Sequence, residues 1–226
     1  MRGARRELLG SAPRGDGHPV LVLPGLLAGD LSTAPLRRFL SELGYAVHGW
    51  EQGINTGPSG ARRDALRDLL LSLHAQHRRR VSLIGWSLGG IYARELTRAF
   101  PDAVRIVITL ASPFRDITAT HALRLVALPE SRGRARTTEE IAAFLRRPIP
   151  RPTTSIYSRT DGIVSWRSCL ETPGDQRENV EVTCSHTGMG FHPTTLSVIA
   201  DRLAQPEGAW EPYPAYAPAH PRDPSP

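Results

Sequence analysis

The pentapeptide Gly85-Trp86-Ser87-Leu88-Gly89 has the pattern G-x-S-x-G, and its neighbours give the pattern a specific context. The apolar run 81–84 before it predicts a buried strand, and the segment after it has the spacing of an amphipathic helix. A strand, a sharp turn and a helix in this order form a nucleophile elbow, which holds a serine hydroxyl above the edge of a sheet. Glycines flank the serine because side chains there would collide across the turn. The sequence therefore predicts a nucleophilic Ser87.

A serine hydroxyl is a poor nucleophile at neutral pH and needs a base, which a third group must orient. Asp161 follows the predicted strand 153–157, at the carboxyl edge where open α/β sheets place their sites. Asp116, which follows the preceding strand, is the reserve candidate for the acid. For the base, we favour His186 over His192, because His186 lies closer to the end of the last predicted strand.

The elements that must position these residues follow from the hydrophobic pattern. Apolar runs predict six strands, at residues 18–23, 45–50, 81–84, 104–110, 153–157 and 180–184. Helices are predicted at residues 35–43 and 61–77, directly after Ser87, and at 121–128, 138–145 and 193–203. Alternating strands and helices predict an α/β fold, with a mostly parallel sheet of about six strands and helices on both faces.

The chain divides into three parts by composition. Residues 1–17 are polar and rich in arginine and glycine, which predicts disorder. Residues 18–204 form one α/β domain, in which the segment of about 114–150 breaks the alternation and predicts a short helical cap. Residues 205–226 contain a run of prolines and predict an extended tail.

Three segments together resemble the α/β-hydrolase superfamily, and in particular its small bacterial esterase- and lipase-like members. They are Leu23-Pro24-Gly25-Leu26-Leu27 after the first strand, Gly85-Trp86-Ser87-Leu88-Gly89-Gly90 at the elbow, and Ser158-Arg159-Thr160-Asp161-Gly162-Ile163-Val164. The resemblance covers about residues 18–204 and implies an α/β-hydrolase fold that starts at the superfamily's third strand. Many relatives carry His-Gly in the first of these loops, whereas this chain has Pro24-Gly25.

The resemblance implies a triad in the superfamily's order, with Ser87 as nucleophile, Asp161 as acid and His186 as base. It also implies an oxyanion hole made by the backbone N–H groups of Leu26 and Leu88.

Four apolar side chains near these segments are plausible walls of a substrate pocket, although aromatic residues beside an elbow often belong to the core. They are Leu27, Trp86, Phe114 and Trp166.

Composition excludes several other functions. All 28 basic residues are arginines, so a P-loop lysine, a Schiff-base lysine and a Ser–Lys dyad are impossible. The net charge of +6 reflects this arginine bias, and no aromatic residues interleave the arginine runs, so we expect no nucleic-acid partner. No histidine spacing suggests a metal, and the chemistry needs no cofactor.

Two further features bear on the compartment. Cys169 and Cys184 are too few for a disulfide framework, and two free thiols are expected. The N-terminus lacks the apolar core of a signal peptide, and no segment approaches the ~20 apolar residues of a membrane span. A cytoplasmic protein is the expectation.

We therefore predict a serine hydrolase that cleaves a small-molecule carboxylic ester through an acyl-enzyme. An acyltransferase or thioesterase could use the same three residues, and a non-catalytic binding protein with this fold would need none of them. The sequence does not predict the oligomeric state.

Overall fold

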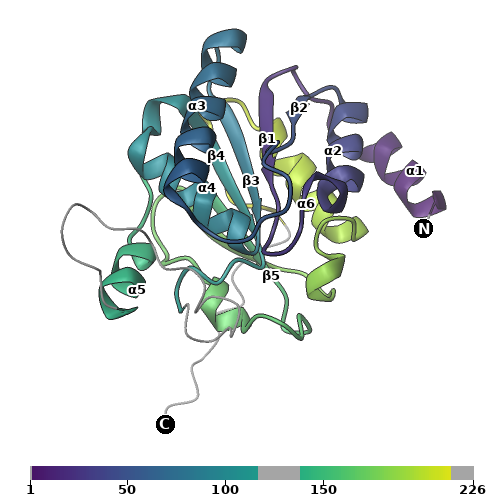
Figure 1. Cartoon of the computed structure of the whole chain (residues 1–226). Coiled ribbons are helices and arrows are strands. Elements are labelled where there is room, and N and C mark those ends of the chain that lie inside the picture. The colour runs from purple at the N-terminus through teal and green to yellow at the C-terminus, as the bar shows by residue number, and fades with distance from the viewer. Residues whose placement is uncertain (1, 117–137, 215–226) are drawn as a thin grey trace.

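The computed structural model of the chain describes residues 2–116 and 138–214 (Figure 1). Its centre is a six-stranded sheet with the order β2-β1-β3-β4-β5-β6, in which every neighbouring pair is parallel. The strands are β1 (Pro19–Leu23), β2 (Ala46–His48), β3 (Val81–Trp86), β4 (Val104–Leu110), β5 (Thr153–Tyr157) and β6 (Arg177–Glu181). The predicted α/β fold is confirmed.

The central strands are apolar on both faces, because helices cover both sides of the sheet. In β1, Val20 and Val22 belong to one hydrophobic cluster, whereas Leu21 and Leu23 belong to the other. This division follows from the pleat, which sends successive side chains to opposite faces. Near-continuous apolar runs are typical of parallel strands buried in this way.

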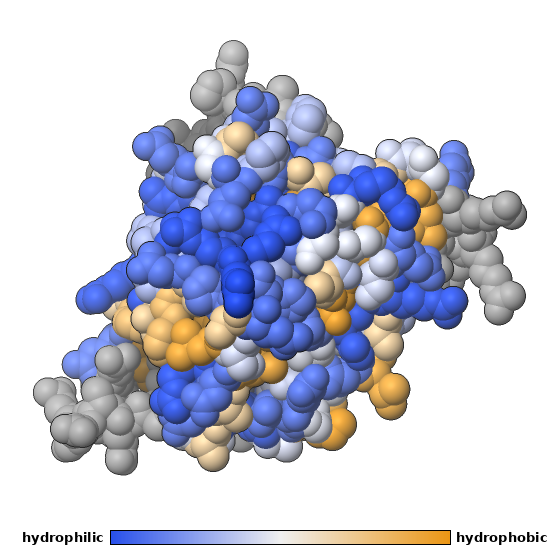
Figure 2. All heavy atoms as spheres, turned by 90° about the horizontal axis from the view of Figure 1, so that it is seen from above, coloured by the Kyte–Doolittle hydropathy of each residue, from blue (hydrophilic) through white to orange (hydrophobic). Residues whose placement is uncertain are grey.

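Two layers of helices enclose the sheet (Figure 1). One face is covered by α2 (Asp30–Leu43) and α6 (Pro193–Ala204), and the other by α3 (Gly60–His77), α4 (Leu88–Ala99) and α5 (Thr138–Arg146). Viewed from above, the molecule presents mainly hydrophilic side chains, with hydrophobic ones in small separate areas (Figure 2).

The strand order has a switch point at the carboxyl ends of β1 and β3. The chain runs from β1 to the edge strand β2 and then returns to β3, on the other side of β1. The connections that leave β1 and β3 therefore diverge to opposite sides, and such a switch point is where open α/β sheets bind ligands. The loop after β1 and the turn at Ser87 meet there.

The first residues differ from the prediction. The segment 1–17 was expected to be disordered, but Arg2–Ser11 form the helix α1. Its Leu8 and Leu9, together with Ala12, pack against the hydrophobic cluster below α2 and α6. These tertiary contacts stabilise a helix that the polar composition of the segment does not suggest.

The last strand also differs in its bounds, because β6 ends at Glu181 whereas residues 180–184 were predicted. As the edge strand it pairs with β5 alone, from Arg177 opposite Thr153 to Glu181 opposite Tyr157. The predicted helix 138–145 is present as α5, and the predicted helix 121–128 lies outside the described residues.

The described start of the proline-rich tail is tied to this same edge. The Tyr213 N–H donates to Glu178 Oε2 at 2.7 Å, and the side chains of Trp210 and Tyr213 pack against the core cluster. Residues 205–214 therefore form part of the folded domain.

Candidate active site

Ser87 occupies a strained turn between β3 and α4. Its φ of 53° and ψ of −117° lie in a region that residues other than glycine rarely adopt, and such strain collects at functional sites. Its N–H donates to the Leu110 carbonyl at 2.8 Å, which fixes the turn to β4. The side chain is partly exposed to solvent.

The glycines around Ser87 allow three segments to meet. A Cβ at Gly85 would overlap the backbone of Gly90, and a Cβ at Gly89 would overlap the Leu23 carbonyl. A Cβ at Gly25, in the loop after β1, would lie 3.2 Å from Ser87 Cβ. The oxyanion-loop segment predicted from the sequence therefore lies directly beside the serine.

His186 and Asp161 form a hydrogen-bonded pair at the same edge. His186 Nδ1 lies 2.8 Å from Asp161 Oδ2, and both side chains are largely buried. The His186 N–H also donates to the Asp161 carbonyl at 3.0 Å. Asp161 Oδ1 accepts the backbone N–H groups of Ile163 and Val164 at 2.9 and 2.6 Å, so both carboxylate oxygens are engaged. A neutral His186 that donates from Nδ1 keeps Nε2 as a proton acceptor.

The His186 ring lies next to the elbow. Its centroid is 6.4 Å from the ring of Trp86, the residue before Ser87. Within the described part of the chain, no hydrogen bond joins Ser87 Oγ to His186. Catalytic hydrogen bonds are often long without substrate and tighten in the complex.

The other acid and base candidates occupy different positions. The carboxylate hydrogen-bonded to His186 belongs to Asp161, and the reserve candidate Asp116 lies after β4. His192 is the N-cap residue of α6, and its N–H donates to the Gly188 carbonyl at 2.9 Å.

The backbone of the loop after β1 is held by Asn55, a residue that no sequence motif singles out. Asn55 Nδ2 donates to the Pro24 carbonyl at 3.0 Å, and the backbone carbonyl of Asn55 accepts the Leu27 N–H at 2.7 Å. Leu26 lies between these two anchored residues. Leu88 is the first residue of α4, so its N–H has no partner within that helix. Both predicted oxyanion donors thus lie on fixed backbone segments.

The four expected pocket residues have different environments. Leu27 is exposed in this loop, and Trp86 is nearly buried beside His186. Phe114 is fully buried in the core cluster of α3 and α4. Trp166 stacks on Tyr157, with their ring centroids 5.8 Å apart.

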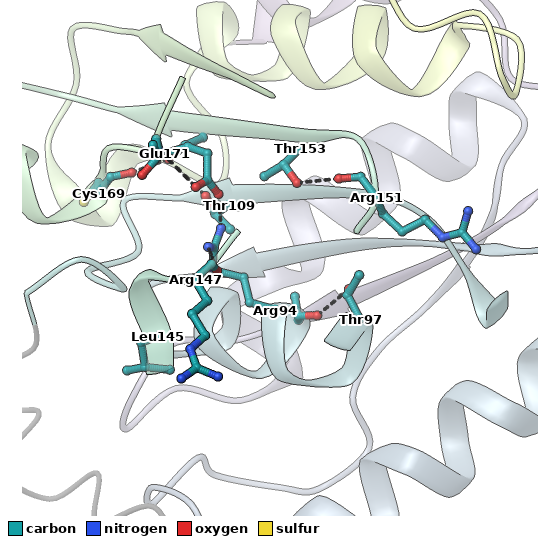
Figure 3. A network of polar contacts seen from close by, with 12 residues as sticks. Arg94, Thr97, Thr109, Leu145, Arg147, Arg151, Thr153, Cys169 and Glu171 are labelled. Carbon is teal, nitrogen blue, oxygen red and sulfur yellow. Dashed lines mark hydrogen bonds and ion pairs between the residues drawn. The ribbon is translucent and has the colours of Figure 1, made fainter. Parts of the chain in front are cut away.

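A buried ion pair connects α4 to the segment that follows β5 (Figure 3). Arg94 in α4 pairs with Glu171, and neither side chain has significant exposure. Arg94 also donates to the Arg147 carbonyl at 3.1 Å, directly after α5, and its guanidinium lies 3.8 Å from the Phe114 ring centroid. Burial lowers the pKa of Arg94, and the charge of Glu171 opposes that shift. The sequence pattern offers no signal for this pair.

Ser82, His18 and Asp16 form a chain of polar contacts at the amino ends of β1 and β3. Ser82 Oγ lies 2.9 Å from His18 Nε2, and His18 Nδ1 lies 2.6 Å from Asp16 Oδ1. Ser82 and His18 are fully buried. Burial, together with the charge of Arg105, lowers the pKa of His18 to about 4. A sealed serine beside so weak a base cannot serve as a nucleophile at neutral pH.

The two cysteines and the possible metal ligands form no further candidate site among the described residues. Cys169 and Cys184 are free and buried, and burial raises the pKa of the Cys169 thiol to about 12. Over residues 2–116 and 138–214, no three histidine, cysteine or carboxylate side chains are grouped to hold a metal. None of the helices in these ranges has the length and apolarity to cross a membrane.

Comparison with solved structures gives the same fold at low sequence identity. A chain of the metagenome-derived lipolytic enzymes LipS and LipT matches with a TM-score of 0.60 and 14% identity, over 84% of this chain and 93% of that one. Lipase B of Aspergillus fumigatus matches with a TM-score of 0.66 and 17% identity, over 88% and 56%. A pyrethroid hydrolase from Sphingobium faniae matches with a TM-score of 0.59 and 18% identity, over 83% and 98%.

Sequence comparisons define the family. A search of curated proteins found no match. The family model described as the alpha/beta hydrolase family matches residues 12–222. Because that match spans nearly the whole chain and the fold agrees with it, this protein belongs to the alpha/beta hydrolase family.

Proposed function

We propose that this protein is a serine hydrolase that cleaves a carboxylic ester through an acyl-enzyme intermediate. The observation that carries the proposal is the placement of Ser87 in a strained elbow at the same edge as the hydrogen-bonded pair of His186 and Asp161. Both features have a cost for folding, because the elbow holds a strained backbone and the pair removes two polar side chains from water.

The acylation half-reaction begins with transfer of the Ser87 hydroxyl proton to His186 Nε2. The Ser87 oxygen attacks the ester carbonyl carbon, and the carbonyl oxygen takes the negative charge. Asp161 holds the imidazole in the required tautomer and stabilises the cation that forms. Collapse of the tetrahedral intermediate breaks the bond to the alcohol oxygen, which receives the proton from His186.

The deacylation half-reaction repeats these steps with water. His186 takes a proton from water, whose oxygen attacks the acyl carbon, and Ser87 leaves with the proton restored. In both half-reactions the N–H groups of Leu26 and Leu88 hold the oxyanion. Each such donor contributes roughly 10²–10³ in rate, because it is already oriented when the charge develops.

The comparisons support this proposal in a general way. Several structures with the same fold carry the names of lipases, lipolytic enzymes and a pyrethroid hydrolase, and the last name gives pyrethroids as the substrates of that protein alone. No cofactor is required by the proposed steps.

A fluorophosphonate probe tests the nucleophile directly. We expect covalent labelling of the wild-type protein at Ser87, found by mass spectrometry of the labelled peptide, and no labelling of Ser87→Ala. Hydrolysis of p-nitrophenyl butyrate should fall by at least about 10³ in Ser87→Ala and in His186→Ala. The proposal is wrong if folded wild-type protein is not labelled, or if Ser87→Ala retains its activity.

A further inference from the structure

The exposed apolar side chains of this protein are concentrated around the candidate site. Among the residues that the structure describes, six large hydrophobic side chains are exposed: Leu27, Leu31, Ile54, Leu71, Ile163 and Phe191. Five of them follow the carboxyl ends of strands, at the edge that holds Ser87, and only Leu71 lies elsewhere, on α3. Single exposed hydrophobic residues need no explanation, but this concentration at one edge does.

Leu27 is unfavourable both in its backbone and in its exposure. It has a φ of 57°, in the left-handed region that a branched side chain avoids, and 72% of its surface is exposed. Neither local geometry nor burial in the folded chain favours leucine at this position. Outliers of this kind cluster at ligand sites, where another molecule supplies the missing contact.

We call the side chains of Leu27, Leu31 and Ile54 the apolar ledge. The loop of Leu27, the start of α2 at Leu31 and the loop of Ile54 are held together by hydrogen bonds. The Leu27 N–H donates to the Asn55 carbonyl at 2.7 Å, and the Asn55 N–H donates to the Ala28 carbonyl at 2.8 Å. Asp30 Oδ1 accepts the Trp50 N–H at 3.0 Å, and Asp30 Oδ2 accepts the Glu51 N–H at 3.1 Å. The backbone that carries the ledge is therefore held in place without a ligand.

The reaction itself assigns the two sides of Ser87. The alcohol leaves with a proton from His186, so the alcohol part of an ester must lie on the side of that ring. The acyl part stays on Ser87 and must extend to the other side. Gly25 lies directly beside Ser87, and the apolar ledge begins two residues later, whereas the His186 ring contacts Trp86 and Asp161.

The other two exposed side chains at this edge, Ile163 and Phe191, follow the acid Asp161 and the base His186 in the sequence. The Ile163 N–H donates to Asp161 Oδ1, and Phe191 follows Gly190, which packs against the Trp86 ring. These two exposed side chains therefore belong to segments that contact the acid and the residue before Ser87, on the side assigned to the alcohol part.

We infer that the apolar ledge is a subsite for the acyl chain, and that the preferred substrates are esters of apolar carboxylic acids longer than a few carbons. This inference rests on the proposed function. The acyl chain of one substrate molecule lies along Leu27 and Ile54, which cover it on one side only. Each added methylene therefore raises the rate by less than full burial of that methylene would. Full burial of one methylene favours binding about fourfold, so about twofold per methylene is expected here.

Two chain-length series with one matched pair of variants test the inference. The acyl series uses p-nitrophenyl esters from butanoyl to octanoyl, and the alcohol series uses acetates of butanol to octanol. Ile54 and Ile163 are similarly exposed, at 57% and 61%, and Ile→Thr keeps the branched shape at both positions. We expect wild-type kcat/KM to rise on the order of tenfold across the acyl series. Ile54→Thr should flatten that rise, whereas Ile163→Thr should preserve it.

Leu27→Asn gives a second variant that is safe for folding, because asparagine tolerates the left-handed region better than leucine. It should flatten the acyl series while its thermal stability stays equal to or above that of the wild type. Leu71→Gln, on α3, should leave both series unchanged. The subsite is wrong if the acyl series keeps its slope in both Ile54→Thr and Leu27→Asn, even though Ser87-dependent hydrolysis persists. Loss of the Ser87 dependence would instead refute the proposed function.

A lipid surface is the other source of apolar chains. All esters are therefore assayed below their critical micelle concentrations, and the octanoyl ester is assayed again in phosphatidylcholine vesicles. A rise across the monomeric series supports the subsite for a single chain. A flat monomeric series together with faster octanoyl hydrolysis in the presence of vesicles overturns it, because the ledge would then contact a lipid surface.

Discussion

Exchange of Ser87 for glycine or alanine separates the strain of the elbow from its chemistry. Both substitutions remove the hydroxyl of the proposed nucleophile, and the two variants differ only by the Cβ atom. At an unstrained position alanine is the more stable of the two by roughly 0.4–1 kcal/mol, because glycine loses more freedom on folding. At Ser87 the backbone angles of 53° and −117° oppose any Cβ, so the order should reverse.

The size of the reversal follows from two terms. Strain of this kind costs roughly 1–3 kcal/mol, and the entropy advantage of alanine opposes it. Ser87→Gly should therefore exceed Ser87→Ala in free energy of unfolding by roughly 0.5–2 kcal/mol. For a domain of this length, 1 kcal/mol corresponds to a shift in Tm of roughly 2–4 °C.

Urea unfolding followed by tryptophan fluorescence measures this difference, since neither variant turns over substrate. The matched control is the same pair of substitutions at Ser72, an exposed position within α3, where alanine should be more stable by about 1 kcal/mol. If alanine is also the more stable residue at position 87, the elbow is not strained and the reasoning about it fails.

Two further predictions concern buried charge. Glu171→Gln leaves the buried guanidinium of Arg94 without a counter-charge, so the free energy of unfolding in urea should fall by about 3–5 kcal/mol, and the double variant with Arg94→Met should recover part of it. The folded pKa of His18, about 4, lies below the ~6.5 of an unfolded histidine. Stability should therefore decrease as pH falls from 6.5 toward 4, by up to roughly 3 kcal/mol.

Controls make both outcomes decisive. A loss below about 1 kcal/mol in Glu171→Gln would mean that the pair is reached by water. For His18, the difference in unfolding free energy between pH 7 and pH 4.5 is compared with that of His18→Gln. Equal differences in the two proteins would show that His18 does not carry the pH dependence.

Hydrophobic pattern predicted the sheet well where strands are buried on both faces. The predicted bounds of Val104–Leu110 and Thr153–Tyr157 agree with β4 and β5, and every residue of both strands is buried. β4 is a near-continuous apolar run, whereas β5 consists mostly of β-branched and aromatic residues, which favour strands. The edge strand β6 was shifted, since Arg177–Glu181 pairs on one side only and its charged residues conceal it. The helix at Arg2–Ser11 was missed, because contacts of Leu8 and Leu9 with distant helices decide its structure.

The candidate site was predictable where one residue type in one position carries the chemistry. Ser87 was identified from the elbow motif, and the expected pairing of His186 with Asp161 is present as a 2.8 Å contact. The supporting contacts were not predictable. Asn55 and the pair of Arg94 with Glu171 act through partners far away in the sequence, and a buried charge looks in the sequence like a solvated one.

The strand order also governs when the site can form during folding. The strands β3, β4, β5 and β6 are neighbours both in sequence and in the sheet, whereas β1 joins β3 across all of β2, α2 and α3. Closing that long connection costs more chain entropy than the local pairings do, so we expect it to follow them. A partly folded chain made of β3 to β6 would hold Ser87, Asp161 and His186 but lack the loop at Gly25. The proposed nucleophile and base would then be assembled before the proposed oxyanion loop, and under the proposed function the return of esterolytic activity in refolding would report the closure of β1 onto β3.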